Sequence, residues 1–427
     1  MNIPQLYEIF VNNGAKVSTD SRNIPDGALF FALRGEKFDG NKFAKSAIEA
    51  GASYAVVDNP EVVENNRFIL VENSLETLQQ LALYHRKQLG IPVLAITGTA
   101  GKTTTKELTA AVLSRKFNVA YTQGNLNNQI GVPLTLLSID KSKEFAVIEM
   151  GASHPGDIRE LCEIADPDYG LITNIGTAHI EGFGSHENLI LTKTELYRYL
   201  EAKDGLVFVN KDNQLLMSRL NTLQVFTYGT KDADVQGEFI EINPLMKFRF
   251  KTDKWYEVQT NLFGEYNFEN ALAAVAIGHY FGIDSQKIKS ALEEYYPKNN
   301  RSQLARTDKN ILILDLYNAN PTSMAKALES FARIDAKEKA VIIGDMLELG
   351  EIEEQEHRKI LSLVASLNFD KVFLVGKIFS NVNDLGFDSF MSSEELADYL
   401  KDNPLEGKTV LLKASRGIHL EKVADVL

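Results

Sequence analysis

Hydrophobic and polar positions alternate along the chain in blocks that predict strands and helices in turn. Short apolar runs at residues 93–97, 118–121, 145–150, 169–175 and 206–210 are typical of buried strands, and segments with helical spacing follow them. This alternation predicts an α/β fold with a mostly parallel sheet and helices on both faces. We assign it to a central domain at residues 88–297.

The central domain ends in a different pattern. Between residues 225 and 263 the apolar positions predict short, half-exposed strands that fit an antiparallel arrangement, and a helix is expected at 267–281. A single long helix is expected at 186–201. Residues 295–300 form the predicted linker to the next domain.

Two further domains flank the central one. Residues 1–87 predict a small α/β domain, with strands at 28–33 and 54–57, a helix at 43–50, and a helix at 74–89 that leads into the central domain.

The strand–helix alternation returns in residues 298–427, with strands expected at 311–314, 340–344, 372–375 and 409–412. These features predict a second doubly wound, Rossmann-like domain.

One stretch carries a clear chemical signal. The strand at 93–97 is followed by Gly98, Gly101, Lys102 and Thr103 and then by a helical pattern. Backbone N–H groups and the positive end of a helix dipole would face an anion here, while Lys102 adds a charge and the Thr103 hydroxyl can bind Mg²⁺. The spacing is the compact form G-x-x-G-K-T, because Ile96 stands where the longer P-loop pattern has its first glycine. A glycine turn with a solvated lysine is the alternative.

Other polar residues follow the predicted strands of the same sheet. Glu149 closes one strand, His179 follows the next, and Asn127 and Asn128 follow a third. Ligands bind beyond the carboxyl ends of parallel strands, so these residues are candidates for a site with Mg²⁺ and a triphosphate. Taken singly, Glu149 also fits a surface acid and His179 a loop histidine. Lys193 alone fits a surface lysine.

Composition narrows the function classes. The net charge of −13 over 427 residues argues against a general nucleic-acid binder. The single cysteine, Cys162, excludes an internal disulfide and fits a reducing cytosol. No secretory signal is visible, and no apolar run approaches the ~18 residues of a membrane span. We therefore expect a cytoplasmic protein without a membrane span. We also expect a monomer.

Motifs along nearly the whole chain resemble the Mur ligase family, and within it the members that add D-alanyl-D-alanine. The matching stretches are residues 19–22, 38–40, 96–104, 125–135, 149–152, 174–179, 270–274, 317–321, 344–350 and 413–417. The compact glycine turn is common to the family. The sequences YNANP at 317–321 and GDMLELG at 344–350 are more particular to these members.

The resemblance implies a reaction and its partners. The family architecture has three domains: UDP-substrate binding, ATPase, and a Rossmann-like domain that closes over the site. The implied reaction is ATP-dependent. The terminal carboxylate of UDP-N-acetylmuramoyl-tripeptide attacks the γ-phosphate, and D-alanyl-D-alanine then attacks the acyl phosphate. Lys102 and two Mg²⁺ ions would reduce the repulsion between the two anions.

The same resemblance implies roles for individual residues. The catalytic and metal-binding set would be Lys102, Thr103, Glu149, His179 and a carbamylated Lys193. ATP would contact Gly98, Thr99, Ala100, Gly101, Lys102, Thr103 and Thr104, with Asn270 at adenine and Arg301 reaching in from the closing domain. The substrates would contact Ser21, Arg22, Phe38, Asp39, Gly40 and Asn41 at the uridine end, Asn127 and Asn128 at the muramoyl peptide, and Asn318, Asn320, Lys413, Ser415 and Arg416 at the incoming dipeptide.

Two alternatives stay open at this point. Another Mur-type or folylpolyglutamate-type ligase would perform the same chemistry with a different amine. A P-loop regulatory ATPase would act through conformational change without forming an amide.

Overall fold

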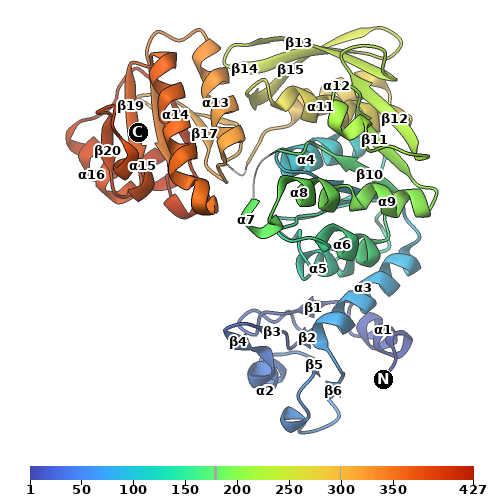
Figure 1. The fold of residues 1–427 in the computed structure, drawn as a ribbon. Helices are drawn as coiled ribbons and strands as arrows, with labels where there is room; N and C mark the ends of the chain where they lie inside the picture. The colour runs from blue at the N-terminus through green and yellow to red at the C-terminus, as the bar shows by residue number, and fades with distance from the viewer. Residues whose placement is uncertain (177–179, 299) are drawn as a thin grey trace.

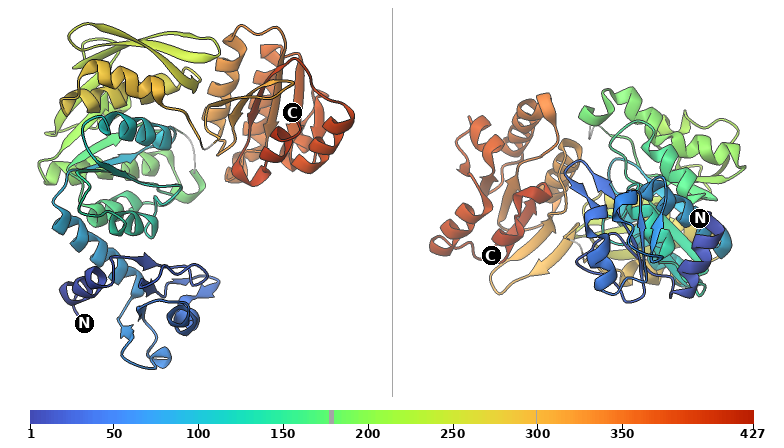
Figure 2. Two further views of the ribbon diagram at one scale, coloured as in Figure 1. Left: turned by 180° about the vertical axis from the view of Figure 1, so that it is seen from behind. Right: turned by 90° about the horizontal axis from the view of Figure 1, so that it is seen from below.

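The computed structural model describes residues 1–176, 180–298 and 300–427. Three units follow one another from the N-terminal unit at the bottom of Figure 1 through the central unit to the C-terminal unit. The view from behind and the view from below in Figure 2 show the same three bodies. The three-domain α/β architecture predicted from the sequence is confirmed, whereas the domain boundaries stay a prediction.

The N-terminal unit is a four-stranded parallel sheet with helices on both faces. The sheet order is β1-β2-β5-β6, beside a small β3–β4 hairpin. The elements are α1 (Ile3–Asn12), β1 (Val17–Ser18), β2 (Leu29–Phe31), β3 (Arg34–Gly35), β4 (Phe38–Asp39), α2 (Ala44–Glu49), β5 (Tyr54–Val57), β6 (Phe68–Leu70) and α3 (Ser74–Leu89). Neighbouring residues of β2 face opposite cores: Phe31 packs with α1 and α3, and Phe30 packs with α2.

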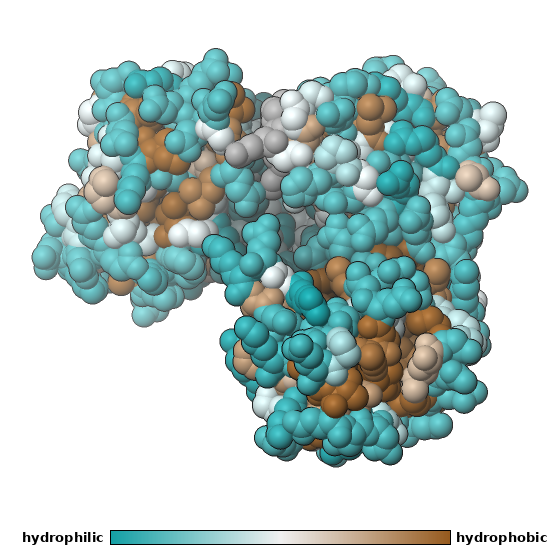
Figure 3. Space-filling model, turned by 60° about the horizontal axis from the view of Figure 1, so that its bottom comes forward, coloured by the Kyte–Doolittle hydropathy of each residue, from teal (hydrophilic) through white to brown (hydrophobic). Residues whose placement is uncertain are grey.

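The surface of this unit is uneven in character. Figure 3 shows apolar side chains gathered on the lower lobe, around a hollow in its face, while the other two lobes are mostly polar in this view. Among the described helices of the whole chain, none has the length and apolar character that crossing a bilayer requires.

The central unit contains the predicted strand–helix alternation. Its strands are β7 (Val93–Thr97), β8 (Val119–Tyr121), β9 (Phe145–Glu149), β10 (Tyr169–Ile172), β11 (Leu206–Asn210), β12 (Gln224–Gly229), β13 (Val235–Ile242), β14 (Leu245–Lys251) and β15 (Trp255–Phe263). Its helices are α4 (Lys102–Leu113), α5 (Gly131–Leu137), α6 (Asp157–Ala165), α7 (Ile180–Phe183), α8 (His186–Lys193), α9 (Glu195–Ala202), α10 (Gln214–Met217), α11 (Asn267–Tyr280) and α12 (Ser285–Glu294).

The central strand β7 is buried on both faces. Val93 and Ala95 belong to the core formed with α3, α5, α6 and α9, whereas Leu94 and Ile96 belong to the core formed with α4, α11 and α12. This explains why the strand reads as a continuous apolar run. The parallel part of the sheet has the order β8-β9-β7-β10-β11-β12-β13, which brings the carboxyl ends of β9, β7 and β10 to one edge.

The antiparallel arrangement expected between residues 225 and 263 is confirmed, because β13 pairs antiparallel with β14 and β14 pairs antiparallel with β15. They are longer than the short strands expected, at eight, seven and nine residues. Their inner faces pack on α11 and α12 through residues such as Phe248 and Val258, and this support allows long strands with one exposed face.

The prediction of one continuous helix at 186–201 is wrong. The chain forms α8 and α9 instead, with Thr194 between them at ψ 0°. The Thr194 hydroxyl donates to the Ile190 carbonyl at 2.8 Å. Periodicity alone does not reveal this break, because a threonine is tolerated in helices. The break leaves Lys193 in the last turn of α8.

The C-terminal unit is a second sheet covered on both faces. Its elements are β16 (Gln303–Arg306), β17 (Ile311–Asp315), α13 (Pro321–Arg333), β18 (Lys339–Gly344), α14 (Glu353–Leu367), β19 (Lys371–Val375), α15 (Lys377–Val382), β20 (Asp388–Phe390), α16 (Ser393–Asp402), β21 (Thr409–Lys413) and α17 (Glu421–Ala424). The order β20-β19-β18-β21-β17 is parallel, and β16 joins antiparallel. One residue pair, Leu262 with Gln303, links β16 to β15 and so joins this sheet to the central one.

Candidate functional site

The loop between β7 and α4 has the backbone of an anion cradle. Gly98 and Gly101 have φ values of 142° and 81°, which favour glycine, and Gly101 caps α4 immediately before Lys102. A Cβ on Gly98 would lie 2.0 Å from the Thr173 hydroxyl. The first N–H groups of α4 therefore start at the loop, where the helix dipole favours an anion.

Neighbouring strand ends hold the loop in shape. The Asn174 side chain accepts from the Ala100 N–H and donates to the Ala100 carbonyl, both at 3.0 Å. The Asn174 backbone carbonyl accepts from the Thr99 N–H at 2.9 Å. Asn174 thus braces the loop from the end of β10, as expected for the carboxyl edge of a parallel sheet.

Lys102 lies over this loop. Its ammonium donates to the carbonyls of Gly98 at 2.8 Å and Thr99 at 3.1 Å. Burial lowers the pKa of Lys102, the carboxylate of Glu149 opposes this effect, and the charge of Arg301 adds to it. A cation of this kind, held by loop carbonyls, is suited to neutralising a phosphate charge.

Glu149 lies at the end of β9, and one of its carboxylate oxygens accepts no hydrogen bond from the described residues. Its Oε1 accepts from Asn127 Nδ2 at 2.9 Å, and its buried Oε2 accepts no hydrogen bond from the described residues. Lys106 Nζ lies 3.7 Å from Oε2, donates to the Thr122 carbonyl, and is fully buried. A buried carboxylate beside a cavity, with one oxygen that accepts no hydrogen bond, is a natural ligand for a hard cation.

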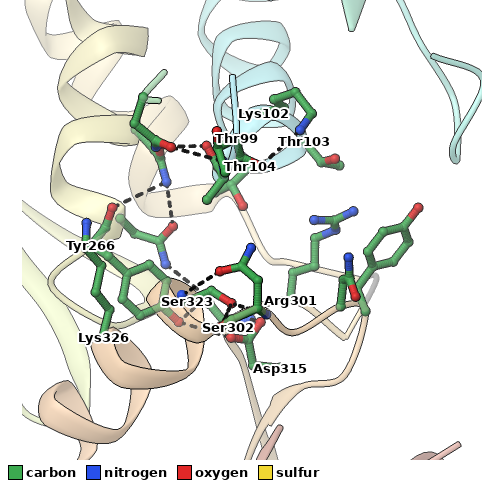
Figure 4. A pocket seen from close by; sticks show the side chains of 18 of the residues that line it. Thr99, Lys102, Thr103, Thr104, Tyr266, Arg301, Ser302, Asp315, Ser323 and Lys326 are labelled. Carbon is green, nitrogen blue, oxygen red and sulfur yellow. Dashed lines mark hydrogen bonds between the residues drawn. The ribbon is translucent and has the colours of Figure 1, made fainter. Parts of the chain in front are cut away.

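The loop and Glu149 open into a cavity of about 260 Å³ between the central and C-terminal units. Figure 4 shows Thr99 and Lys102 to Thr104 on the α4 side, opposite Arg301, Ser302 and Asp315. Cationic residues lining this cavity are Lys102, Arg301, Lys326 and Lys413, and acidic ones are Glu149, Glu269 and Asp315. Other predicted residues on its wall are Thr99, Ala100, Gly101, Thr103, Thr104, Asn127, Asn270, Asn318 and Asn320.

Arg301 enters the cavity from the C-terminal side. Its guanidinium carbon lies 3.4 Å from the centroid of the Tyr317 ring, and its buried Nε has no hydrogen-bond partner among the described residues. Arg416 approaches the same ring at 5.5 Å and lines a neighbouring cavity of about 380 Å³ together with Thr103 and Arg301. Two guanidinium groups thus lie near the phosphate loop, and the predicted contact of Arg301 with ATP stays a prediction.

Lys193 belongs to a second cavity, of about 410 Å³, which it shares with Lys102, Gly98, Asn127 and Asn128. Its side chain is only 3% exposed. Burial and then the charge of Lys102 hold the pKa of Lys193 well below its ordinary value. The surface-lysine alternative for Lys193 is therefore wrong: this is a buried amine that faces the site.

Two residues on the C-terminal side already have partners within the protein. The Lys413 ammonium contacts Asp315 Oδ2 at 2.5 Å. The Ser415 hydroxyl accepts from the Leu347 N–H and donates to the Ala319 carbonyl. Both residues therefore fix the loops around the cavity, and their contact with a dipeptide stays a prediction.

The predicted uridine-binding residues lie apart from this cavity, in the N-terminal unit. Arg22 pairs with Asp20 on the surface, and Phe38 is 54% exposed. Asn41 is buried and donates to Asp39 and Asp58, while a Cβ at Gly40 would lie 2.5 Å from the Leu33 carbonyl. Asn41 and Gly40 thus have clear structural roles and Arg22 is paired with Asp20, whereas the exposed Phe38 ring is accessible to a ligand.

His179 lies outside the described residues, so its predicted place beside Lys102 and Glu149 stays a prediction. Within the described ranges, no group of three His, Cys, Asp or Glu side chains gathers as a complete metal site. A divalent ion at Glu149 would thus need oxygen ligands from phosphate or water.

Sequence reasoning missed several residues of the site. Lys106, Tyr266, Ser302, Asp315 and Lys326 contact its residues or line its cavity. The spacing of Lys106, one helical turn after Lys102, was a usable signal. The others come from segments far apart in the sequence, and only the tertiary fold brings them together.

Comparison with known proteins gives consistent results over the whole chain. The family model for the Mur ligase family, catalytic domain, matches residues 15–102. The Mur ligase middle domain matches residues 96–278, and the Mur ligase glutamate ligase domain matches residues 300–418.

Individual relatives match at nearly full length. A UDP-N-acetylmuramoyl-tripeptide–D-alanyl-D-alanine ligase of Bacillus subtilis (strain 168) is 36% identical, over 99% of this chain and 94% of the relative. A crystal structure of MurF from Acinetobacter baumannii has a TM-score of 0.87 at 31% identity, over 96% of this chain and 93% of that one. MurF ligase from Thermotoga maritima in complex with ADP has a TM-score of 0.86 at 27% identity, over 96% of each chain.

We predict that Gly98→Ala abolishes nucleotide binding, because the added Cβ would collide with the Thr173 hydroxyl and force the loop open. Titration with a fluorescent ADP analogue measures the loss. Gly90→Ala is the matched control, since Gly90 also has a positive φ of 64° but no atom lies within 4 Å of its added Cβ. Nucleotide binding by the Gly98→Ala variant equal to that of the control would contradict the cradle geometry.

Proposed function

Since the chain belongs to the Mur ligase family, a family of ATP-dependent ligases, we propose that it joins D-alanyl-D-alanine to UDP-N-acetylmuramoyl-tripeptide, forming ADP. The observation that carries this proposal is the near full-length match to ligases with that activity, together with a single cavity that unites the phosphate loop and the YNANP segment.

The first step brings two anions together. The terminal carboxylate of the tripeptide attacks the γ-phosphorus of ATP, the bond from that phosphorus to the bridging oxygen of ADP breaks, and an acyl phosphate forms. At 4 Å the repulsion is about 4 kcal/mol per pair of unit charges at an effective dielectric of ~20. Lys102 and Arg301 flank the phosphate end of the cavity, where fixed cations lower this repulsion without needing to reorganise.

The second step forms the amide. The free amine of D-alanyl-D-alanine attacks the acyl carbon, the bond from that carbon to the phosphate oxygen breaks, and inorganic phosphate leaves while the amine loses a proton. The protein contributes mainly by positioning and by excluding water, because the acyl phosphate hydrolyses easily. Asn318, Asn320, Lys413, Ser415 and Arg416 are the proposed contacts on this side.

Residues suited to Mg²⁺ are present. Glu149 lines the cavity and its Oε2 accepts no hydrogen bond from the described residues, and Thr103 lies in the first turn of α4 at the same wall. Bound there, Mg²⁺ would supply charge neutralisation for the phosphate oxygens. Glu149 and Thr103 would hold one ion, and His179 with Lys193 a second.

Carbamylation of Lys193 is part of this proposal. Its amine is buried, belongs to the same cavity as Lys102, and lies 5.8 Å from the centroid of the Phe183 ring. Only a neutral amine reacts with CO₂, and burial favours that form. The carbamate would replace a cation that repels metal by an anionic oxygen ligand.

The remaining contacts complete the assignment. Asn270, behind the loop, would contact adenine, and Asn127 and Asn128 would face the muramoyl peptide. At the uridine end we retain Ser21, Arg22, Phe38, Asp39, Gly40 and Asn41. Cytoplasmic location and a monomeric state stay predictions.

We predict that phosphate release from ATP requires both UDP-N-acetylmuramoyl-tripeptide and D-alanyl-D-alanine. A coupled phosphate assay with each substrate omitted in turn, and with mass detection of the amide product, measures this.

We predict that Lys102→Ala reduces turnover in this assay by at least about a hundredfold, because it removes the positive charge that is proposed to neutralise the phosphates.

The same assay separates the alternatives. Turnover with single amino acids or with glutamate in place of the dipeptide would identify another ligase of this type. Slow hydrolysis without an acceptor and without an amide product would identify a regulatory ATPase.

We predict that Lys193→Ala is nearly inactive and that short carboxylates such as acetate partly restore its activity, because they can replace the carbamate oxygen. Lys203→Ala is the matched control, since Lys203 lies on the surface and pairs with Asp166 outside both cavities. Activity of Lys193→Ala at the level of Lys203→Ala would show that Lys193 has no role in the reaction.

A further inference from the structure

A line of buried polar side chains crosses from the central unit to the C-terminal unit along the wall of the cavity. It begins at Thr105 in α4, passes through Asn270 and Asn267 in α11, and ends at Ser302. Asn267, Asn270 and Ser302 are 1%, 7% and 3% exposed. Because buried hydrogen bonds are costly to break, such a line holds its elements in a fixed arrangement.

The distances show a continuous connection. Thr105 Oγ1 donates to Asn270 Oδ1 at 3.0 Å, and Asn270 Nδ2 donates to Asn267 Oδ1 at 3.0 Å. Asn267 Nδ2 then donates to Ser302 Oγ, also at 3.0 Å. Asn270 also lies against the phosphate loop. A Cβ added to Gly101 would lie 2.5 Å from Asn270 Oδ1, so Asn270 occupies the space that a side chain at this position would need.

A second residue of the central unit contacts the same serine. The Tyr266 hydroxyl lies 2.9 Å from Ser302 Oγ and approaches Asp315 Oδ2 at 3.5 Å. Figure 4 shows Tyr266, Ser302 and Asp315 on one side of the pocket. The Ser302 hydroxyl therefore connects α11 and its N-terminal flank to the C-terminal unit through hydrogen bonds.

The segment that carries Arg301 has an unusual backbone conformation next to these hydrogen bonds. Asn300 and Ser302, on either side of Arg301, have φ values of 51° and 49°, a conformation that non-glycine residues rarely adopt. The Ser302 carbonyl also accepts from the Phe263 N–H at 3.0 Å. Two left-handed residues persist only where surrounding contacts determine them. Here those contacts come from both units, since the Asn300 carbonyl also accepts from the Leu316 N–H at 2.7 Å and the Ser302 N–H donates to Asp315 Oδ1 at 3.4 Å.

We propose that Ser302 is a positioning residue. Through its hydrogen bond to Asn267, and from there through Asn270, it holds Arg301 at a fixed position relative to the phosphate loop. The inference rests on the proposed function, in which Arg301 acts on the terminal phosphate of ATP. Loss of the Ser302 hydroxyl frees the arginine segment while Lys102, the loop and Glu149 stay in place. Its effect is therefore confined to ligands that reach Arg301.

The test is a double-mutant cycle on nucleotide affinity, measured by calorimetry with MgATP and with MgADP. Ser302→Ala should weaken MgATP about five- to tenfold, the usual effect of one lost hydrogen bond, and MgADP less than about twofold. In the Arg301→Ala background the same change should have no further effect on MgATP, because Ser302 acts through Arg301. Tyr266→Phe should act in the same direction and more weakly, since the bond from Asn267 remains.

The matched control is Ser285→Ala, which removes a buried hydroxyl that bonds Thr252 Oγ1 at 2.7 Å within the central unit. It should leave both affinities unchanged. An additive loss in the Arg301→Ala background, an equal loss for MgADP, or no loss in Ser302→Ala would each overturn the proposal. Since nucleotide binding needs neither peptide substrate, a failure of D-alanyl-D-alanine ligation in the wild-type protein would be recognised separately.

Discussion

The constraint on which the site depends is the mutual repulsion of a carboxylate and a triphosphate. The whole chain carries a net charge of −13, yet four cationic and three acidic residues line the main cavity. One of those acids, Asp315, pairs with Lys413, one of those cations, which leaves three cationic and two acidic residues. The fold thus places a locally positive surface within an acidic protein, and a fixed charge in a partly buried site acts much more strongly than one in water.

The arrangement of the units follows from that constraint. The phosphate loop and Glu149 lie at the carboxyl edge of the central sheet, while Arg301 and Tyr317 belong to the segment that begins the C-terminal unit. The two sheets are joined by one residue pair between β15 and β16. Phe263 of the central unit also packs against Phe331 in the core of the C-terminal unit, and the buried hydrogen bond between Asn267 and Ser302 helps to specify where the units meet.

Much of the fold was predictable because burial leaves a clear trace in the sequence. The strand at 93–97 and the glycine loop were predicted correctly, since a doubly buried strand must be apolar and a tight turn needs glycine. The break at Thr194 was not predicted, because a hydroxyl that bonds the preceding turn leaves the periodicity unchanged.

The site was only partly predictable for a similar reason. Lys102 and Glu149 follow strands of one parallel sheet, so their shared edge follows from topology. Asn41 and Ser415 were predicted as substrate contacts, and the structure shows hydrogen bonds that tie each to its own surroundings. Ser302 could not be found from the sequence, since its importance arises from Asn267, which lies 35 positions away.

The central claim is that fixed cations allow the tripeptide carboxylate to reach the γ-phosphorus and form an acyl phosphate. The most direct measurement labels that carboxylate with ¹⁸O and analyses the inorganic phosphate released during ligation by mass spectrometry. The account predicts one ¹⁸O atom in each phosphate released, because the bridging oxygen leaves with phosphorus when the amine attacks carbon. Amide formation with unlabelled phosphate would contradict it.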